Sequence, residues 1–204
     1  MGKYDELLSR LVADDNGYLH ISRLTALGID RSYAYPYVKE HNLKKVARGT
    51  YCLQNLRPDM MFVICRRNSE VVLSHESAAY IHGFLKEEPE YVSVTVSHGY
   101  NTKHLTEKWV RVYQSNAPLD KLGKISIKDL YGNRVNVFNA ERTVCDCVKE
   151  SEYKHRDKDT LERASIAAFK AGKLSSDRLF EYADKMRIRG KIEAFLEVFN
   201  EPCK

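Results

Sequence analysis

Five short segments in the middle of the chain constrain its fold most. They are rich in Val, Ile, Tyr and Trp and are bounded by Gly, Asn or Pro, which is the pattern of strands separated by turns. They cover residues 71–73, 91–96, 109–114, 125–129 and 134–138. Gly132-Asn133, between the last two, is typical of a tight hairpin turn. The sequence therefore predicts a small sheet in this region.

Helical periodicity precedes and follows the predicted sheet. Three short helices are predicted before residue 42, the second capped by Ser22 and facing inward with Leu24 and Leu27. From Asn139 onwards, apolar side chains again recur at helical spacing. The predicted fold class is therefore α+β, with a small sheet in a mixed C-terminal domain and helices at the C-terminal end.

The length and composition favour two domains. The chain has 204 residues, of which 43% are hydrophobic, enough for one sizeable core or two modest ones. Arg57-Pro58 marks a boundary, because the residue before a proline is biased away from the helical conformation. We predict an N-terminal domain over residues 1–56 and a C-terminal domain over 57–204.

Several functional classes are disfavoured. The first apolar cluster has helical spacing interrupted by charges, unlike a secretory signal, and no apolar run reaches the roughly 18 residues of a membrane span. Five cysteines, an odd number without framework spacing, favour reduced thiols in the cytoplasm. Cys145-Asp-Cys147 stands without a second pair, so we predict core packing, no metal and no cofactor.

The predicted third helix belongs to a basic segment. Residues 31–48 contain five Lys or Arg against Glu40 alone, a net charge of +4. At about 100° per residue, Ala34 and Tyr37 face a core, while Ser32, Tyr35, Pro36 and Lys39 face outward. Pro36 removes one helical hydrogen bond, so it should kink a helix begun at Arg31 or delay its start to about Tyr35.

A basic hairpin is predicted directly after this helix. Two strand-like runs flank Ala47-Arg48-Gly49, whose glycine permits the turn. Three helices followed by a basic hairpin are typical of a winged helix-turn-helix, with a recognition helix in the major groove and a wing on phosphates. The predicted DNA-binding residues are Arg23, Arg31, Ser32, Tyr33, Tyr35, Lys39, Lys44, Lys45 and Arg48.

Four segments of this sequence resemble the AbiEi family, the antitoxins and transcriptional regulators of type IV toxin–antitoxin systems. Residues 17–53 resemble its N-terminal winged helix through Leu24, Gly28-Ile29 and Arg48-Gly49-Thr50-Tyr51. The other matches are 73–83, with its Ala-Ala and His-Gly pairs, 94–101, beginning Val-Thr-Val, and 131–146, containing Glu-Arg-Thr and Asp. They occur in family order over nearly the whole chain.

The resemblance implies a function. It implies a cytoplasmic repressor, nucleoid-associated when bound to inverted repeats upstream of its own operon, that takes part in abortive infection and phage defence. It also implies neutralisation of a cognate nucleotidyltransferase-like toxin without a stable complex. Residues in the matched C-terminal segments become candidates for antitoxin function: Ser74, His75, His82, Glu141, Arg142 and Asp146.

Catalysis and a simpler regulatory role are the alternatives. Ser74, His75 and Glu76 suggest a hydrolase, but adjacent residues on one helix point about 100° apart and cannot all converge. The spacing of Arg142 and Asp146 is that of an i,i+4 ion pair. We predict that the protein is not an enzyme and has no catalytic residue. The open alternative is a solitary winged-helix regulator with a sensor or nucleic-acid-processing C-terminal domain.

Overall fold

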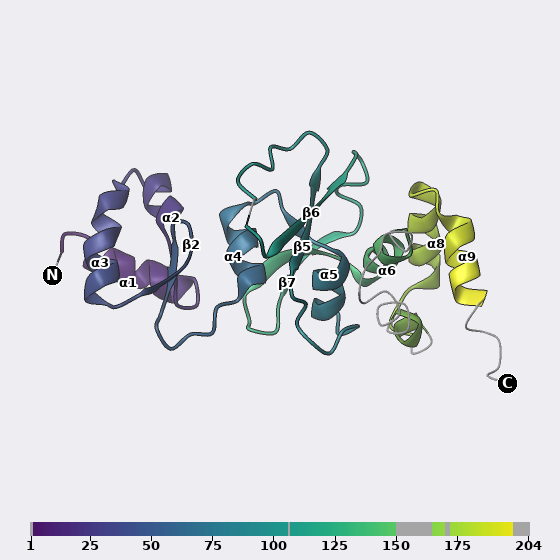
Figure 1. Cartoon of the computed structure of the whole chain (residues 1–204), viewed down its shortest axis with the longest axis horizontal. Coiled ribbons are helices and arrows are strands. Elements are labelled where there is room, and N and C mark those ends of the chain that lie inside the picture. The colour runs from purple at the N-terminus through teal and green to yellow at the C-terminus, as the bar shows by residue number, and fades with distance from the viewer. Residues whose placement is uncertain (1, 106, 150–164, 170–171, 198–204) are drawn as a thin grey trace. The chain divides into compact units, whose positions relative to one another are not determined.

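The computed structural model describes residues 2–105, 107–149, 165–169 and 172–197 (Figure 1). These residues form helices and two sheets, of three and five strands, which confirms the mixed α+β class. They divide into two compact units. The first contains the described residues up to Ser69 together with Tyr131–Asn133, and the second contains the rest. The division follows Ser69, whereas the sequence predicted a boundary between residues 56 and 57.

The first unit begins with helices and ends with a helix after its sheet. Its elements are α1 (Asp5–Asp14), β1 (Tyr18–His20), α2 (Ile21–Ala26), the 3-10 turn η1 (Arg31–Tyr33), α3 (Ala34–Glu40), β2 (Lys44–Ala47), β3 (Thr50–Cys52) and α4 (Met60–Arg67). The sheet is antiparallel in the order β1-β3-β2. The turn between β2 and β3 contains Gly49 at φ +69°, a left-handed backbone that favours glycine.

A single apolar cluster holds the helices of the first unit together. Leu8 and Leu11 of α1, Leu24 of α2, and Ala34 and Tyr37 of α3 are all buried in it. Leu24, Ala34 and Tyr37 are residues that the helical periodicity assigned to the core, so the inward face of α3 was predicted correctly.

The proline in the third helix delays its start. Asp30 accepts a hydrogen bond from the Ser32 amide at 2.7 Å and so caps η1, and α3 begins only at Ala34. Pro36 is then the third residue of α3, where a backbone amide has no intrahelical acceptor. The predicted delay is confirmed, and the outward-facing residues Ser32, Tyr35, Pro36 and Lys39 are exposed.

Two local predictions for the second helix are wrong. Helix α2 begins at Ile21 with His20 in the capping position, so Ser22 is not its cap. Leu27 lies at the C-terminal end of α2 and is 55% exposed instead of inward. The strand β1 was not predicted, because its three residues are all buried and show no alternation.

The second unit contains a five-stranded sheet and helices on its C-terminal side. Its elements are β4 (Val72–Leu73), α5 (His75–Ile81), β5 (Val92–Ser97), β6 (Val110–Ser115), β7 (Lys124–Lys128), β8 (Arg134–Phe138), α6 (Ala140–Lys149), α8 (Ser176–Lys185) and α9 (Arg189–Glu197). The strand order is β6-β5-β4-β8-β7. The pairs β5–β6 and β4–β8 are parallel, and the other two pairs are antiparallel. All five predicted strands are present.

Strand β5 is buried on both faces although its sequence alternates. Val92, Val94 and Val96 lie on one face, and the hydroxyl residues Ser93 and Thr95 lie on the other. Helix α5 meets the hydroxyl face: Ser77 Oγ accepts the Ser93 amide at 2.8 Å, and Glu76 Oε2 accepts the Ser93 hydroxyl at 2.7 Å. The polar face is therefore satisfied by a helix instead of by solvent.

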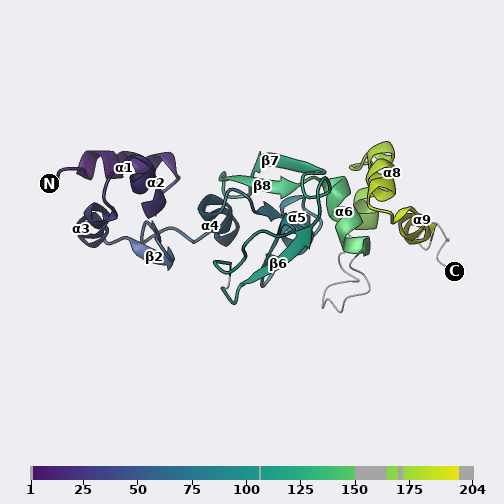
Figure 2. The ribbon, with the colours of Figure 1, turned by 90° about the horizontal axis from the view of Figure 1, so that it is seen from above.

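The C-terminal helices form the second apolar cluster. Val144 of α6, Leu179 of α8 and Ile192 of α9 are buried together there with Ala79 of α5. Figure 2 shows α6, α8 and α9 together at one side of the five-stranded sheet. Helix α6 contributes to this cluster and also follows β8 directly, so it connects the sheet to the helical end.

Candidate functional site

The exposed side of η1 and α3 presents tyrosine and basic side chains. Tyr33 is 45% exposed and Tyr35 is 51% exposed, which is unusual for such large side chains in a small domain. Arg31 and Lys39 are exposed beside them in sequence. Tyr37, on the opposite side, is buried and shares a hydrogen bond with Ser9 of α1 at 3.0 Å between the hydroxyl oxygens. The buried Tyr37 therefore fixes α3 against α1, and the exposed tyrosine and basic side chains lie on the opposite side of α3.

Tyr33 is positioned by a residue that sequence reasoning missed. Its ring meets that of Tyr4 edge to face, with 4.8 Å between centroids. Lys3 Nζ lies 5.2 Å from the centroid of the Tyr4 ring, a cation–π distance. These contacts join the beginning of α1 to η1 across 29 positions of sequence, and no local pattern signals them.

The β2–β3 hairpin carries the second group of basic residues. Lys45 and Arg48 are exposed, while Lys44 is half-buried and donates from Nζ to the Gln54 carbonyl at 3.0 Å. Within the described part of the chain, Arg31, Lys39, Lys45 and Arg48 form no ion pair. These four predicted residues therefore remain available to an anionic ligand. Lys44 is less available, because its Nζ already donates to the Gln54 carbonyl.

Arg23 differs from the other predicted DNA-binding residues. Its Nη1 lies 2.9 Å from Asp15 Oδ2, and Arg66 of α4 reaches Asp15 Oδ1 at 3.1 Å. One buried carboxylate is thus shared by two guanidinium groups. A phosphate would have to compete with Asp15 for Arg23, so we rank Arg23 below Arg31 as a phosphate ligand.

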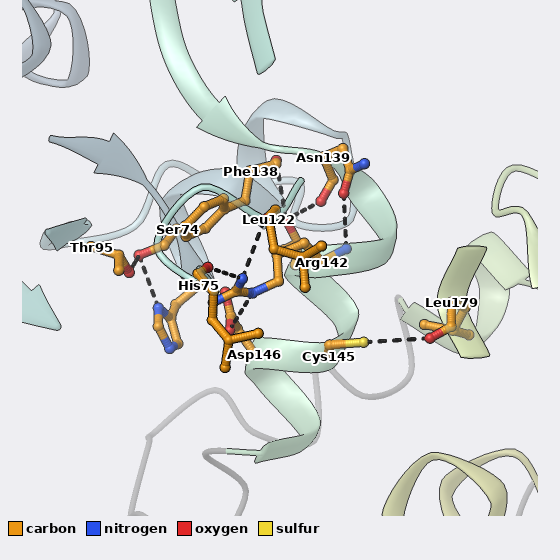
Figure 3. Close-up of polar contacts among 12 residues, drawn as sticks. Ser74, His75, Thr95, Leu122, Phe138, Asn139, Arg142, Cys145, Asp146 and Leu179 are labelled. Atoms are coloured by element: carbon orange, nitrogen blue, oxygen red, sulfur yellow. Dashed lines mark hydrogen bonds and ion pairs between the residues drawn. The ribbon is translucent and has the colours of Figure 1, made fainter. Parts of the chain in front are cut away.

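Ser74, at the capping position of α5, and His75, the first residue of that helix, contact each other in the second unit. His75 has φ +47°, a conformation that non-glycine residues rarely adopt. Nδ1 lies 2.9 Å from Ser74 Oγ, which also accepts the Thr95 hydroxyl at 2.8 Å (Figure 3). The His75 ring stacks on Tyr113 at 3.6 Å between centroids.

The Ser–His pair is enclosed by the fold. Ser74 is fully buried, and Glu76 Oε2 accepts the Ser93 hydroxyl. A nucleophile must reach its substrate, and the third member of a triad must hydrogen-bond the base. The arrangement fixes the start of α5 against β5 and β6.

Arg142 and Asp146 form the buried ion pair that their spacing predicted. Arg142 Nε donates to Asp146 Oδ1 at 2.9 Å, and Nη1 donates to the carbonyls of Leu119 and Leu122 at 2.5 and 3.2 Å (Figure 3). Its guanidinium also lies 4.5 Å from the centroid of the Phe138 ring. Burial raises the pKa of Asp146, and the guanidinium opposes that shift. Arg142 thereby ties α6 to the loop before β7.

His82 and Glu141 make separate contacts. Nε2 of His82 donates to the Phe138 carbonyl at 2.7 Å, and burial lowers the pKa of this histidine. Glu141 Oε1 accepts the Ser175 amide at 3.0 Å, at the beginning of α8, and Oε2 lies 3.6 Å from Arg178 Nη1. These hydrogen bonds join four of the six antitoxin candidates in two pairs, Ser74–His75 and Arg142–Asp146, while His82 and Glu141 bind the Phe138 carbonyl and the Ser175 amide.

No metal or membrane site accompanies these clusters in the described ranges. There, no group of three or more His, Cys, Asp or Glu side chains is arranged to hold a metal ion. No helix among those residues has the length and apolar character needed to span a bilayer.

Comparison with known proteins identifies a shared fold. No family model and no curated protein matches the sequence. The crystal structure of the Rv2827c protein from Mycobacterium tuberculosis is similar over 98% of this chain and 82% of its own, with a TM-score of 0.56 and 13% sequence identity. At this identity the likeness concerns the fold alone. It extends over nearly the whole chain, including both units.

Proposed function

We propose that the first unit is a winged helix-turn-helix domain that binds duplex DNA. One observation carries the proposal: two exposed tyrosines and four basic side chains without ion-pair partners occur on the outer side of η1–α3 and on the following hairpin. Exposed aromatic and unpaired basic groups are what base and phosphate contacts require. The AbiEi resemblance of residues 17–53 independently supports the same assignment.

The proposed mechanism assigns different tasks to helix and hairpin. An α-helix fits the major groove, which is about 12 Å wide. Ser32, Tyr33, Tyr35 and Lys39 would face base edges there, while Arg31 binds phosphate at the start of the helix. Lys45 and Arg48 would bind phosphates along the backbone as a wing, with Lys44 and Arg23 contributing less because other groups already engage them.

The hairpin assignment predicts a sequence-independent loss. For the variant Lys45→Gln/Arg48→Gln we expect weaker binding to operator and random duplex alike, because phosphates carry no sequence information. Each lost phosphate contact lowers the salt slope of log affinity by about 0.9, so the double variant should lose about 1.8. Fluorescence anisotropy at several salt concentrations measures this.

A matched control tests whether charge alone matters. Lys86→Gln/Lys103→Gln removes the same charge from two exposed lysines of the second unit and should leave the slope unchanged. A hairpin variant that behaves like this control would refute the wing assignment.

Tyr33→Ala and Tyr35→Ala should chiefly reduce discrimination between operator and random DNA, and equal losses of affinity for both would argue against base contacts.

We further propose that the chain is a cytoplasmic type IV antitoxin that represses its own operon. This rests on the AbiEi resemblance, which implies inverted repeats and a nucleotidyltransferase-like toxin encoded nearby. The test is expression of the neighbouring reading frame with and without this protein. A neighbouring product that is toxic alone and harmless in its presence supports the antitoxin role, whereas no toxic neighbour favours the solitary regulator.

A further inference from the structure

Asp15 is a buried carboxylate that binds two arginines from two different helices. It follows α1 as its C-cap residue, is 9% exposed, and accepts hydrogen bonds from Arg23 of α2 and Arg66 of α4. All three residues belong to the first unit. A buried carboxylate needs a cationic partner, because an unpaired charge in the interior is strongly destabilising. Asp15 has two such partners, so one of them can be withdrawn.

The two arginines hold Asp15 in different ways. Arg66 reaches both carboxylate oxygens: its Nη2 lies 3.1 Å from Oδ1 and 3.2 Å from Oδ2, and its Nε lies 3.4 Å from Oδ2. Arg23 reaches Oδ2 alone, from Nη1 at 2.9 Å. A contact of two guanidinium nitrogens with both oxygens is the bidentate arrangement that suits a carboxylate. Arg66 can therefore keep Asp15 paired when Arg23 leaves.

Arg23 is the partner that can leave. Its side chain is 30% exposed and that of Asp15 is 10% exposed, so solvent reaches the guanidinium much more than the carboxylate. Within the described residues, Asp15 is the sole hydrogen-bond partner of the Arg23 side chain. The remaining donors of its guanidinium thus stay open to a second anion. A phosphate beside α2 can bind Arg23 without leaving an unpaired carboxylate in the interior.

We propose that Arg66 is a positioning residue for DNA binding, which holds Asp15 so that Arg23 can bind a phosphate of the duplex. The proposal rests on the proposed DNA-binding function and deepens it, because it explains how an arginine already in an ion pair takes part. Arg66 acts through Asp15 and contacts no phosphate itself. Without Arg66, the buried carboxylate depends on Arg23 alone and keeps it from the DNA.

Salt slopes of full-length variants on the DNA upstream of the reading frame test this role. Loss of one phosphate contact lowers the slope of log affinity by about 0.9. Arg66→Met should therefore have a slope about 0.9 below that of wild type, and between 50 and 200 mM salt it should lose about 3.5-fold less affinity. The control Arg10→Met removes an exposed arginine of α1 that forms no ion pair within the described residues, and it should match wild type.

The double variant Arg66→Met/Asp15→Asn distinguishes an indirect role of Arg66 from a direct one. Asparagine is uncharged, so Arg23 is released and the wild-type slope should return. If Arg66 contacts DNA itself, or if its loss merely disturbs the fold, the slope of the double variant stays low and the proposal is overturned. Arg66→Met/Asp14→Asn is the charge-matched control, because Asp14 is the exposed neighbour of Asp15, and it should keep the low slope.

Arg23→Gln completes the test. It should lower the slope by the same amount of about 0.9, and adding Arg66→Met should lower it no further, because both changes remove one contact. Additive losses would overturn the proposal. If Arg66→Met has the wild-type slope while Lys45→Gln/Arg48→Gln lowers it, only this inference fails; if wild-type protein binds no duplex, the proposed function fails as well.

Discussion

Substitution of Arg142 tests most directly how much the buried ion pair stabilises the second unit. Arg142 is 2% exposed and donates hydrogen bonds to Asp146 Oδ1 and to two backbone carbonyls. Arg142→Met keeps an unbranched apolar stem beside Phe138 but leaves a buried carboxylate without its guanidinium. Breaking a buried pair on one side costs about 3–5 kcal/mol of unfolding free energy.

The double variant Arg142→Met/Asp146→Leu distinguishes the energetic cost of the unpaired carboxylate from that of the carbonyls left without a donor. Removing both charges avoids the unpaired ion, so the remaining cost should fall to about 1–3 kcal/mol, that of the carbonyls left without a donor. The exposed Arg189, paired with Asp184 and Glu193, is the matched control, and Arg189→Met should cost less than about 1 kcal/mol.

Urea unfolding followed by Trp109 fluorescence measures these differences. Trp109 is the sole tryptophan of the sequence and immediately precedes β6, so its signal reports on the second unit. A cost below about 1 kcal/mol for Arg142→Met would refute the reasoning, and so would a double variant no more stable than the single one. If the pair acts structurally, the double variant should also recover toxin neutralisation relative to Arg142→Met.

Two further predictions concern the first unit. Burial lowers the pKa of His20 to about 4, so folding favours its neutral form. The contribution of His20 to the free energy of unfolding should therefore be complete above pH 6.5. It should fall by up to about 3 kcal/mol as the pH drops to 4. Thermal unfolding by circular dichroism at several pH values should show this loss in wild type and not in His20→Leu; identical pH profiles would contradict it. Pro36→Ala should change the unfolding free energy by less than about 1 kcal/mol, because the third residue of α3 needs no amide donor. A loss above about 3 kcal/mol in the same assay would show that the proline has another role.

The sequence predicted the features that local patterns determine. Strand composition located all five strands of the larger sheet, and the 100° step separated Tyr37, which is buried, from Tyr35, which is exposed. Pro36 placed the start of α3 to within one residue, at Ala34 instead of Tyr35. In each case the physical cause lies within a few residues of the effect.

Features set by distant contacts were not predictable in this way. Asn133 was read as a turn residue, but it is buried: its Nδ2 donates to Asp59 Oδ2 at 2.7 Å, and its Oδ1 accepts Asn16 Nδ2 at 2.8 Å. These partners are 74 and 117 positions away. His75, which contacts Ser74, has a left-handed backbone that no side-chain pattern encodes.

The central claim is sequence-specific DNA binding by the first unit. The most direct test is the affinity of the wild-type protein for DNA upstream of its own reading frame, relative to a random duplex of equal length at the same salt concentration. We predict at least about 10³-fold tighter binding to the upstream DNA, as for specific regulators. Equal affinity for the two duplexes would contradict the account.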